Sequence, residues 1–105
     1  MKQGLLLVMT DIAPADEADF NRWYEEEHLD ERMRIPGFLN ARRFTAIEGG
    51  PKYLALYDLE SPEVLQSAPY RDVIGAGTSA WTKGMQTKFI NFRRNVYVQI
   101  SARGR

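Results

Sequence analysis

The sequence predicts an α+β fold in which a four-stranded antiparallel sheet carries two helices on one face. Apolar segments of strand length alternate with segments of helical periodicity in the order strand, helix, strand, strand, helix, strand. The chain has 105 residues, which suits a single domain over residues 1–105 with one core. The predicted strands are apolar on both faces, which indicates that the face without helices packs against a partner.

The first part of the chain contains one strand and one long helix. The continuous apolar run GLLLVMT predicts a buried strand over residues 4–10. A helix then extends from about residue 15 to residue 33, with Asp16 as the expected N-cap and Asp19 in the first turn, where an acidic side chain suits the helix dipole. The Pro-Gly pair at residues 36–37 ends this helix.

A hairpin and a short helix follow. Residues 38–47 and 52–59 predict two paired strands, because the intervening EGGP is a turn sequence. Ser-Pro-Glu at residues 61–63 predicts the start of a helix, since Ser is favoured as N-cap and Pro at the first helical position. We expect this helix to end near Pro69.

The last third of the chain is predicted to end in a strand. Residues 70–84 contain three glycines, so we expect a helical piece, a loop and a further turn there. Residues 88–100 predict a long strand that bends near residues 93–95. The complete order is the split βαβ pattern of ferredoxin-like folds.

The composition excludes several kinds of site and partner. The chain has 14 basic and 14 acidic residues, so its net charge gives no reason to expect a nucleic-acid partner. The absence of cysteine excludes disulfides, thiol nucleophiles and cysteine-ligated metals, and it suits a reducing cytoplasm. The apolar run near the start is too short for a signal peptide, and no segment approaches the about 20 apolar residues of a membrane span. We expect a cytoplasmic protein without a membrane partner.

The charges are unevenly placed along the chain. Residues 11–31 carry many acidic side chains and one basic residue, Arg22, whereas the chain from Lys83 onward carries only basic ones. We expect the two regions to attract each other, within a protomer or between protomers; a charged ligand is the alternative.

The two-sided strands predict a homodimer. Leu5, Leu7 and Met9 alternate with Leu6 and Val8, and the strand over residues 52–59 alternates in the same way. Helices cover only one face of such a sheet, and a second copy of the chain is the simplest cover for the other. We therefore expect two sheets packed face to face.

The stretch FNRWYEEEHL, residues 20–29, contains the only histidine, His28. With the helical period, Phe20, Trp23 and Tyr24 form one stripe that faces the sheet, and His28 lies at its edge. Glu27 and Glu31 interrupt this stripe.

A carboxylate on the sheet-facing side is costly unless it is paired or hydrated. Arg42 and Arg43 are adjacent on the second strand, so one of them must point toward the helices. We expect that arginine to pair with a carboxylate of the stripe; the sequence leaves open which arginine it is.

The phrases FNRWYEEEHL, PGF and ARRF resemble the dimeric α/β-barrel superfamily, and in particular its EthD-like group, which carries an aromatic pair followed by histidine in the first helix. KYLALYDLESP is similar to the continuation in small bacterial members. The superfamily includes lactone isomerases, polyketide cyclases, cofactor-free monooxygenases and haem-degrading relatives. The order of the aromatic pair is reversed here, Asp30 stands where many members have Pro, and the second helix lacks the histidine of the haem-degrading relatives.

These residues together predict an acid–base site between helix and sheet. An imidazole is suited to moving a proton at neutral pH, tyrosines can hold a substrate oxygen, and tryptophans provide flat apolar walls. The expected catalytic residues are His28, Tyr24 and Arg43. The expected substrate-binding residues are Trp23, Glu27, Arg42, Tyr53, Tyr57 and Trp81. The expected ligand is a small aromatic or lactone-like molecule, with no cofactor and no metal.

Three functions stay open at this stage. The first is an enzyme, a cofactor-free isomerase, cyclase or similar proton-transfer catalyst that uses His28. The second is a non-catalytic dimer that binds a small ligand or has an accessory role. The third is a structural dimer without a pocket, in which a backbone carbonyl or a carboxylate such as Asp58 satisfies His28. The substrate, the reaction and any assembly beyond the dimer do not follow from the sequence.

Overall fold

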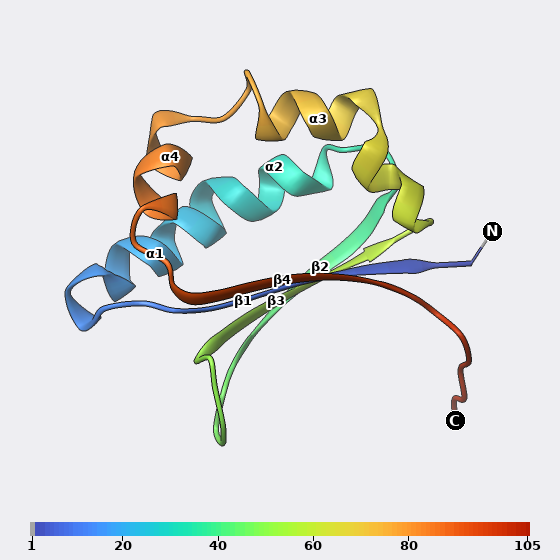
Figure 1. Cartoon of the computed structure of the whole chain (residues 1–105), viewed down its shortest axis with the longest axis horizontal. Coiled ribbons are helices and arrows are strands. Elements are labelled where there is room, and N and C mark those ends of the chain that lie inside the picture. The colour runs from blue at the N-terminus through green and yellow to red at the C-terminus, as the bar shows by residue number, and fades with distance from the viewer. Residues whose placement is uncertain (1) are drawn as a thin grey trace.

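The computed structural model describes residues 2–105 and has a four-stranded antiparallel sheet with every helix on one face (Figure 1). The strand order in the sheet is β2-β3-β1-β4. The strands are β1 (Gly4–Asp11), β2 (Phe38–Thr45), β3 (Tyr53–Leu59) and β4 (Ile90–Val98). This is the predicted α+β, ferredoxin-like arrangement, and the fold-class prediction is confirmed.

A continuous helical segment crosses the sheet after β1. It consists of η1 (Pro14–Asp16), α1 (Glu17–Trp23), η2 (Tyr24–His28) and α2 (Leu29–Met33). The segment η2 is a π turn, in which the Leu29 amide donates to the Tyr24 carbonyl five residues earlier. Asp16 stands at the N-cap of α1 but makes no capping hydrogen bond; its carboxylate lies 3.4 Å from the Lys88 amine instead. The predicted helix is therefore present, with a change of period at its centre.

The second helical segment differs from the prediction in two places. It contains η3 (Pro62–Gln66), α3 (Ala68–Ile74) and α4 (Ala80–Gln86). Pro69 does not end a helix but lies in the first turn of α3, where its missing N–H is harmless, and Ser67 caps that helix by accepting from the Tyr70 amide. After the loop that follows α3, the helix α4 stands where we expected only a turn.

The chain returns to the sheet at Gly37, where only glycine fits. Gly37 has φ +98°, and a Cβ there would lie 2.4 Å from Cγ2 of Val64. At the other edge, the irregularity of β4 lies at Asn91, which has φ 55°, rather than at the predicted residues 93–95. Asparagine tolerates this left-handed conformation better than most residues, which explains the earlier position of the bend.

The strand register separates two apolar faces. Leu6, Val8, Ala55 and Tyr57 point toward the helices, whereas Leu5 pairs with Asp58 on the open face. The other members of the open face near the centre of the sheet are Leu7, Met9, Leu54 and Leu56. The register also places Arg43, opposite Ala55, on the helix side and Arg42, opposite Leu56, on the open side.

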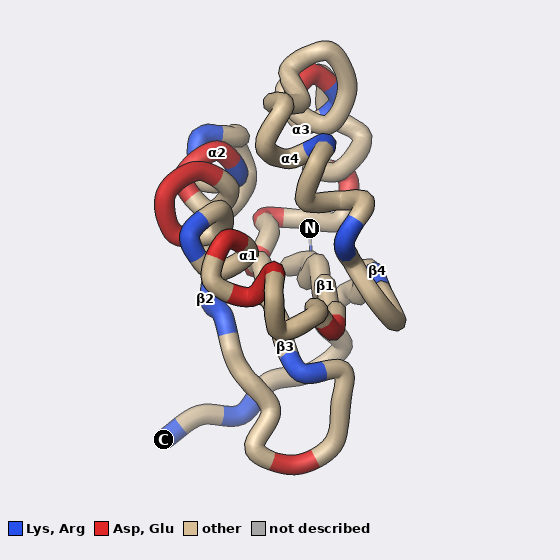
Figure 2. The backbone as a smooth tube through the Cα atoms, turned by 90° about the vertical axis from the view of Figure 1, so that its left-hand side faces the viewer, with Lys and Arg blue, Asp and Glu red and all other residues tan. Residues whose placement is uncertain are grey.

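Acidic segments of α1 and α2 lie above a basic segment of β2 (Figure 2). Most ion pairs of the acidic region involve Arg22, Arg43 or Lys52. From the basic region at the end of the chain, Lys88 forms an ion pair with Asp16 of the acidic region. Across residues 2–105, no helix is long and apolar enough to cross a membrane.

Candidate functional site

A cavity of about 250 Å³ lies between the helical layer and the sheet. Its walls come from β1, β3, the long helix, α3, α4 and β4, and its rim reaches solvent through the partly exposed side chains of Ile74 and Phe92. The lining residues are Leu6, Val8, Trp23, Tyr24, His28, Arg32, Tyr57, Tyr70, Ile74, Gln86, Phe89, Phe92 and Arg94. The lining is mainly aromatic and aliphatic, with a small number of polar groups, as in many small-molecule sites.

The π turn decides where His28 points. Residues five apart on a regular α-helix are about 140° apart around the axis, so Trp23 and His28 would not meet. Here their rings stack with centroids 4.2 Å apart, and the Tyr24 ring meets His28 edge-on at 5.1 Å. His28 is consequently 8% exposed and belongs to the aromatic wall rather than to its edge.

His28 is neutral in this environment. Burial, and then the positive charges of Arg32 and Arg43, lower the pKa of His28 from 6.5 to about 3. Its Nδ1 atom is buried and has no hydrogen-bond partner in residues 2–105. Asp58, the carboxylate considered from the sequence, lies on the open face and pairs with Arg42 instead.

Tyr57 provides a second unpaired polar group in the same wall. Its side chain is 1% exposed, and its hydroxyl finds no partner in hydrogen-bond geometry within residues 2–105. Burial, and then the neighbouring Tyr24 hydroxyl, raise the pKa of Tyr57 well above 10.0, so this group stays protonated and can donate a hydrogen bond. Buried polar atoms without partners are rare in folded proteins, and two in one wall indicate a place for a ligand or water.

Two arginines complete the polar part of the cavity. Arg32 is 9% exposed; its guanidinium lies 3.2 Å from a Glu31 oxygen and 5.9 Å from the centre of the Tyr70 ring. Arg94 of β4 donates to the Tyr70 hydroxyl at 3.1 Å. Both positive groups therefore meet at Tyr70.

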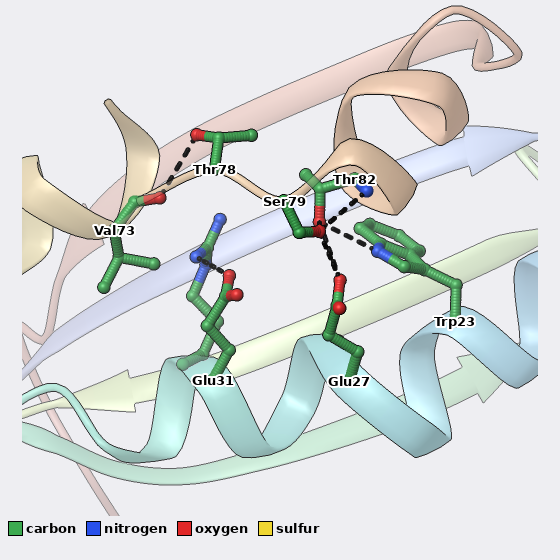
Figure 3. Close-up of polar contacts among 8 residues, drawn as sticks. Trp23, Glu27, Glu31, Val73, Thr78, Ser79 and Thr82 are labelled. Carbon is green, nitrogen blue, oxygen red and sulfur yellow. Dashed lines mark hydrogen bonds and ion pairs between the residues drawn. The ribbon is translucent and has the colours of Figure 1, made fainter. Parts of the chain in front are cut away.

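The carboxylate of Glu27 joins the long helix to the start of α4 and does not line the cavity. Figure 3 shows it reaching from η2 to Ser79 and Thr82 at the start of α4. The Ser79 and Thr82 hydroxyls donate to Glu27 at 2.6 and 3.2 Å, and the Trp23 indole N–H donates to the Thr82 hydroxyl at 3.0 Å. The network thereby fixes the Trp23 ring on which His28 stacks.

The expected carboxylate–guanidinium pair across helix and sheet does not form from the stripe. Glu27 binds hydroxyls, and Glu31 pairs with its neighbour Arg32. The π turn changes the direction of the side chains after Trp23. A prediction that assumes a regular α-helical period therefore places these two carboxylates on the wrong face.

Arg43 and Tyr53 lie beside the cavity, in a filled corner. Arg43 donates to Asn21 at 2.7 Å and to Glu25 at 2.8 Å, and its guanidinium lies 4.3 Å from the centre of the Tyr24 ring. The Tyr53 hydroxyl donates to Glu17 at 2.5 Å.

The two remaining residues expected at the site lie elsewhere. The Trp81 indole donates to Asp19 at 3.3 Å, and Arg22 covers its ring, so Trp81 braces α4 against α1. Arg42 is on the open face of the sheet. Among the nine residues expected at the site, Trp23, Tyr24, His28 and Tyr57 line the cavity.

The sequence did not point to Arg32, Tyr70, Arg94, Phe89 or Phe92 as residues of the cavity. A signal existed for Arg94, because strand alternation places it on the same face as Val96. No local pattern indicated Tyr70, which reaches the cavity from a helical piece whose bounds the sequence did not define. Within residues 2–105, no three histidine, cysteine, aspartate or glutamate side chains gather to hold a metal ion.

No protein-family model matches the chain, and no curated protein matches it in sequence. Among solved structures, a mutant of SnoaB, a cofactor-independent oxygenase from Streptomyces nogalater, has 11% identity and a TM-score of 0.74 over 97% of each chain. A dimeric ferredoxin-like protein from an uncultured marine organism has 15% identity and a TM-score of 0.75, covering 100% of this chain and 94% of that one.

The haem degrader MhuD from Mycobacterium tuberculosis, solved with two haems in its active site, has 14% identity and a TM-score of 0.72 over 96% of this chain and 99% of that one. At sequence identities this low, the similarity to these structures shows a shared fold and nothing about function. Membership of the EthD-like group stays a prediction. The comparisons therefore establish that this chain has the ferredoxin-like α+β fold of these proteins.

Proposed function

We propose that the protein binds a small, planar organic molecule in the cavity between helix and sheet. The observation that carries this proposal is the pair of unpaired polar groups, His28 Nδ1 and the Tyr57 hydroxyl, within an aromatic wall around about 250 Å³ of space. Both atoms are buried within the wall, so a ligand reaches them only by displacing a neighbouring side chain, and its oxygen would then accept from the Tyr57 hydroxyl. Aromatic or lactone-like molecules match the flat walls made by Trp23 and Tyr24.

The pKa of His28 favours a binding role over proton transfer. With a pKa of about 3, its imidazole is neutral at pH 7 and is a weak base. The isomerase or cyclase hypothesis requires a ligand that restores this pKa toward neutrality, and none of the proteins compared supports that chemistry. The oxygenase named among the solved structures supports a second candidate, cofactor-independent oxygenation of a bound aromatic molecule. Product analysis and oxygen uptake with a bound compound distinguish these activities from binding alone.

His28 is a natural reporter for the binding test, because it is the only histidine in the chain. We would follow its ring protons by NMR while adding small aromatic and lactone compounds. A compound in the cavity is expected to shift these signals in a saturable manner. Tyr57→Phe should weaken the binding, whereas the matched change Tyr53→Phe, outside the cavity, should not. The absence of any His28 shift across the panel contradicts the proposal.

We also propose that a second copy covers the open face of the sheet. The face is apolar at its centre, no helix of residues 2–105 covers it, and one of the compared proteins of this fold is dimeric (Figure 1). Leu56→Glu places a charge at this centre and should give monomers in sedimentation, while Met33→Glu, an exposed change on α2, should leave dimers. A dimer that survives Leu56→Glu contradicts the face-to-face arrangement.

A further inference from the structure

The cavity carries an unbalanced positive charge. Its lining contains two arginines, Arg32 and Arg94, and no carboxylate residue. Glu31 neutralises Arg32 through one contact at 3.2 Å, and no carboxylate within residues 2–105 forms an ion pair with Arg94. The unmatched charge therefore comes from Arg94, an exposed residue whose side chain reaches the cavity, and it favours an anionic ligand.

The arrangement around Tyr70 concentrates this charge. Tyr70 is 4% exposed, its ring lies under the Arg32 guanidinium, and its hydroxyl oxygen accepts from Arg94. Because the oxygen accepts that hydrogen bond, the Tyr70 hydroxyl proton is left to donate to another oxygen. Two guanidinium groups and a phenolic donor thus meet at one side of an otherwise apolar cavity.

From this geometry we infer that the ligand is a small aromatic carboxylate, and that Arg94 and Arg32 select it by charge. The inference rests on the proposed binding function and specifies the class of ligand. The planar fork of a guanidinium matches the two oxygens of a carboxylate, and Arg94 uses one of its terminal nitrogens on Tyr70 and keeps the others. The aromatic part of the ligand would lie against Trp23, and the carboxylate would lie toward Tyr70.

The test compares 2-naphthoate with 2-naphthamide, which has nearly the same shape but no charge. Both are titrated into the full chain, with the His28 ring signals as the readout. We expect naphthoate to bind at least about tenfold more tightly than the amide, and Arg94→Gln to remove about tenfold from naphthoate affinity only. Arg94 is exposed on the edge strand β4, so this variant should fold.

A matched control is next to it in the sequence. Arg93→Gln removes the same charge from the opposite face of β4, since Arg93 pairs with Met9 and Arg94 with Val8. It should leave the affinity for both compounds unchanged. Arg32→Lys, which keeps the charge and loses the fork, should weaken naphthoate binding without changing amide binding.

Each outcome has a separate meaning. Equal binding of acid and amide, or naphthoate binding that survives Arg94→Gln, overturns the charge selection and leaves the binding function standing. Equal losses from Arg93→Gln and Arg94→Gln indicate general electrostatic attraction and also overturn it. If neither compound nor any other member of the panel shifts the His28 signals, the binding function itself fails, and this inference fails with it.

Discussion

The two ends of the helix–sheet interface use similar side chains in opposite ways. At the filled end, Tyr53, Arg43 and Asn21 lie in one network of hydrogen bonds that also holds Glu17. At the cavity end, His28 and Tyr57 are buried more deeply than Tyr53, yet a polar atom of each has no partner among residues 2–105.

The contrast between the two ends shows that residue type alone does not identify the site. Tyr53 and Tyr57 are both on β3, face the same helices and were equally plausible from the sequence. They differ because the acidic first turn of α1 provides Glu17 beside Tyr53, whereas the hydroxyl nearest in effect to Tyr57, that of Tyr24, does not lie in hydrogen-bond geometry with it. A site is marked by the combination of space and unsatisfied polar atoms.

The largest loss in the free energy of unfolding is expected when a large side chain is removed from the filled end. Phe20 is fully buried there; its ring meets the Tyr24 ring edge-on and is tilted against the Tyr53 ring. Phe20→Ala should lower the free energy of unfolding by about 3–5 kcal/mol, because no side chain can refill the volume. Urea denaturation measures this, with Ile74→Ala at the cavity rim as the mild control. A loss below about 1 kcal/mol would mean that this end is as loosely packed as the cavity.

A smaller loss in the free energy of unfolding is expected when the pH is lowered. It arises from His28 at the cavity end of the interface. The pKa of His28 is about 3 in the folded chain and 6.5 when exposed, so the unfolded state binds one more proton between these values. The free energy of unfolding should therefore rise with pH in this window, and about 2 kcal/mol should be lost between about pH 8 and about pH 5.

His28→Phe is the control for this pH dependence, because it keeps the ring stacked on Trp23 but cannot titrate. The difference between wild type and variant removes the contributions of carboxylates, including Glu31, whose pKa is raised by burial and whose effect has the opposite sign. Equal pH dependence of the two proteins would show that the pKa of His28 in the folded chain is close to its value in the unfolded chain, which contradicts its burial as a neutral group.

The smallest effect gives the sharpest comparison, because the same chemical change is made at both ends. Tyr53→Phe removes a hydroxyl that donates to Glu17 and should lower the free energy of unfolding by about 1 kcal/mol. Tyr57→Phe removes a hydroxyl without a partner and should raise it by up to about 1 kcal/mol. Thermal and urea denaturation measure both. A loss of stability in Tyr57→Phe would show that a bound water or the neighbouring Tyr24 hydroxyl satisfies this group.

Much of the architecture was predictable, because it depends on patterns within short segments. The apolar run of β1, the hairpin of β2 and β3, and the Ser-Pro start of η3 all express local preferences. Pro69 was misread for the same reason, since a proline marks a helix start as readily as a helix end.

The site was predictable only in part. The stripe of Phe20, Trp23 and Tyr24 does face the sheet, because the regular period holds up to the π turn. Beyond it the phase changes, so His28 moves into the wall and Glu27 turns toward α4. The sequence carries no clear signal for this π turn.

Patterns within short segments were enough to predict the order of the strands, the two apolar faces of the sheet and the aromatic stripe near the single histidine. Those features follow from side-chain periodicity and from proline and glycine, which act over a few residues. Three features depend on the folded chain as a whole. They are which arginine faces the helices, the lack of a partner within residues 2–105 for His28 Nδ1 and the Tyr57 hydroxyl, and the meeting of Arg32, Tyr70 and Arg94 at one cavity. Such contacts join segments distant in the sequence, and they depend on the register of the strands and the phase of a helix, which a shift of one residue reverses.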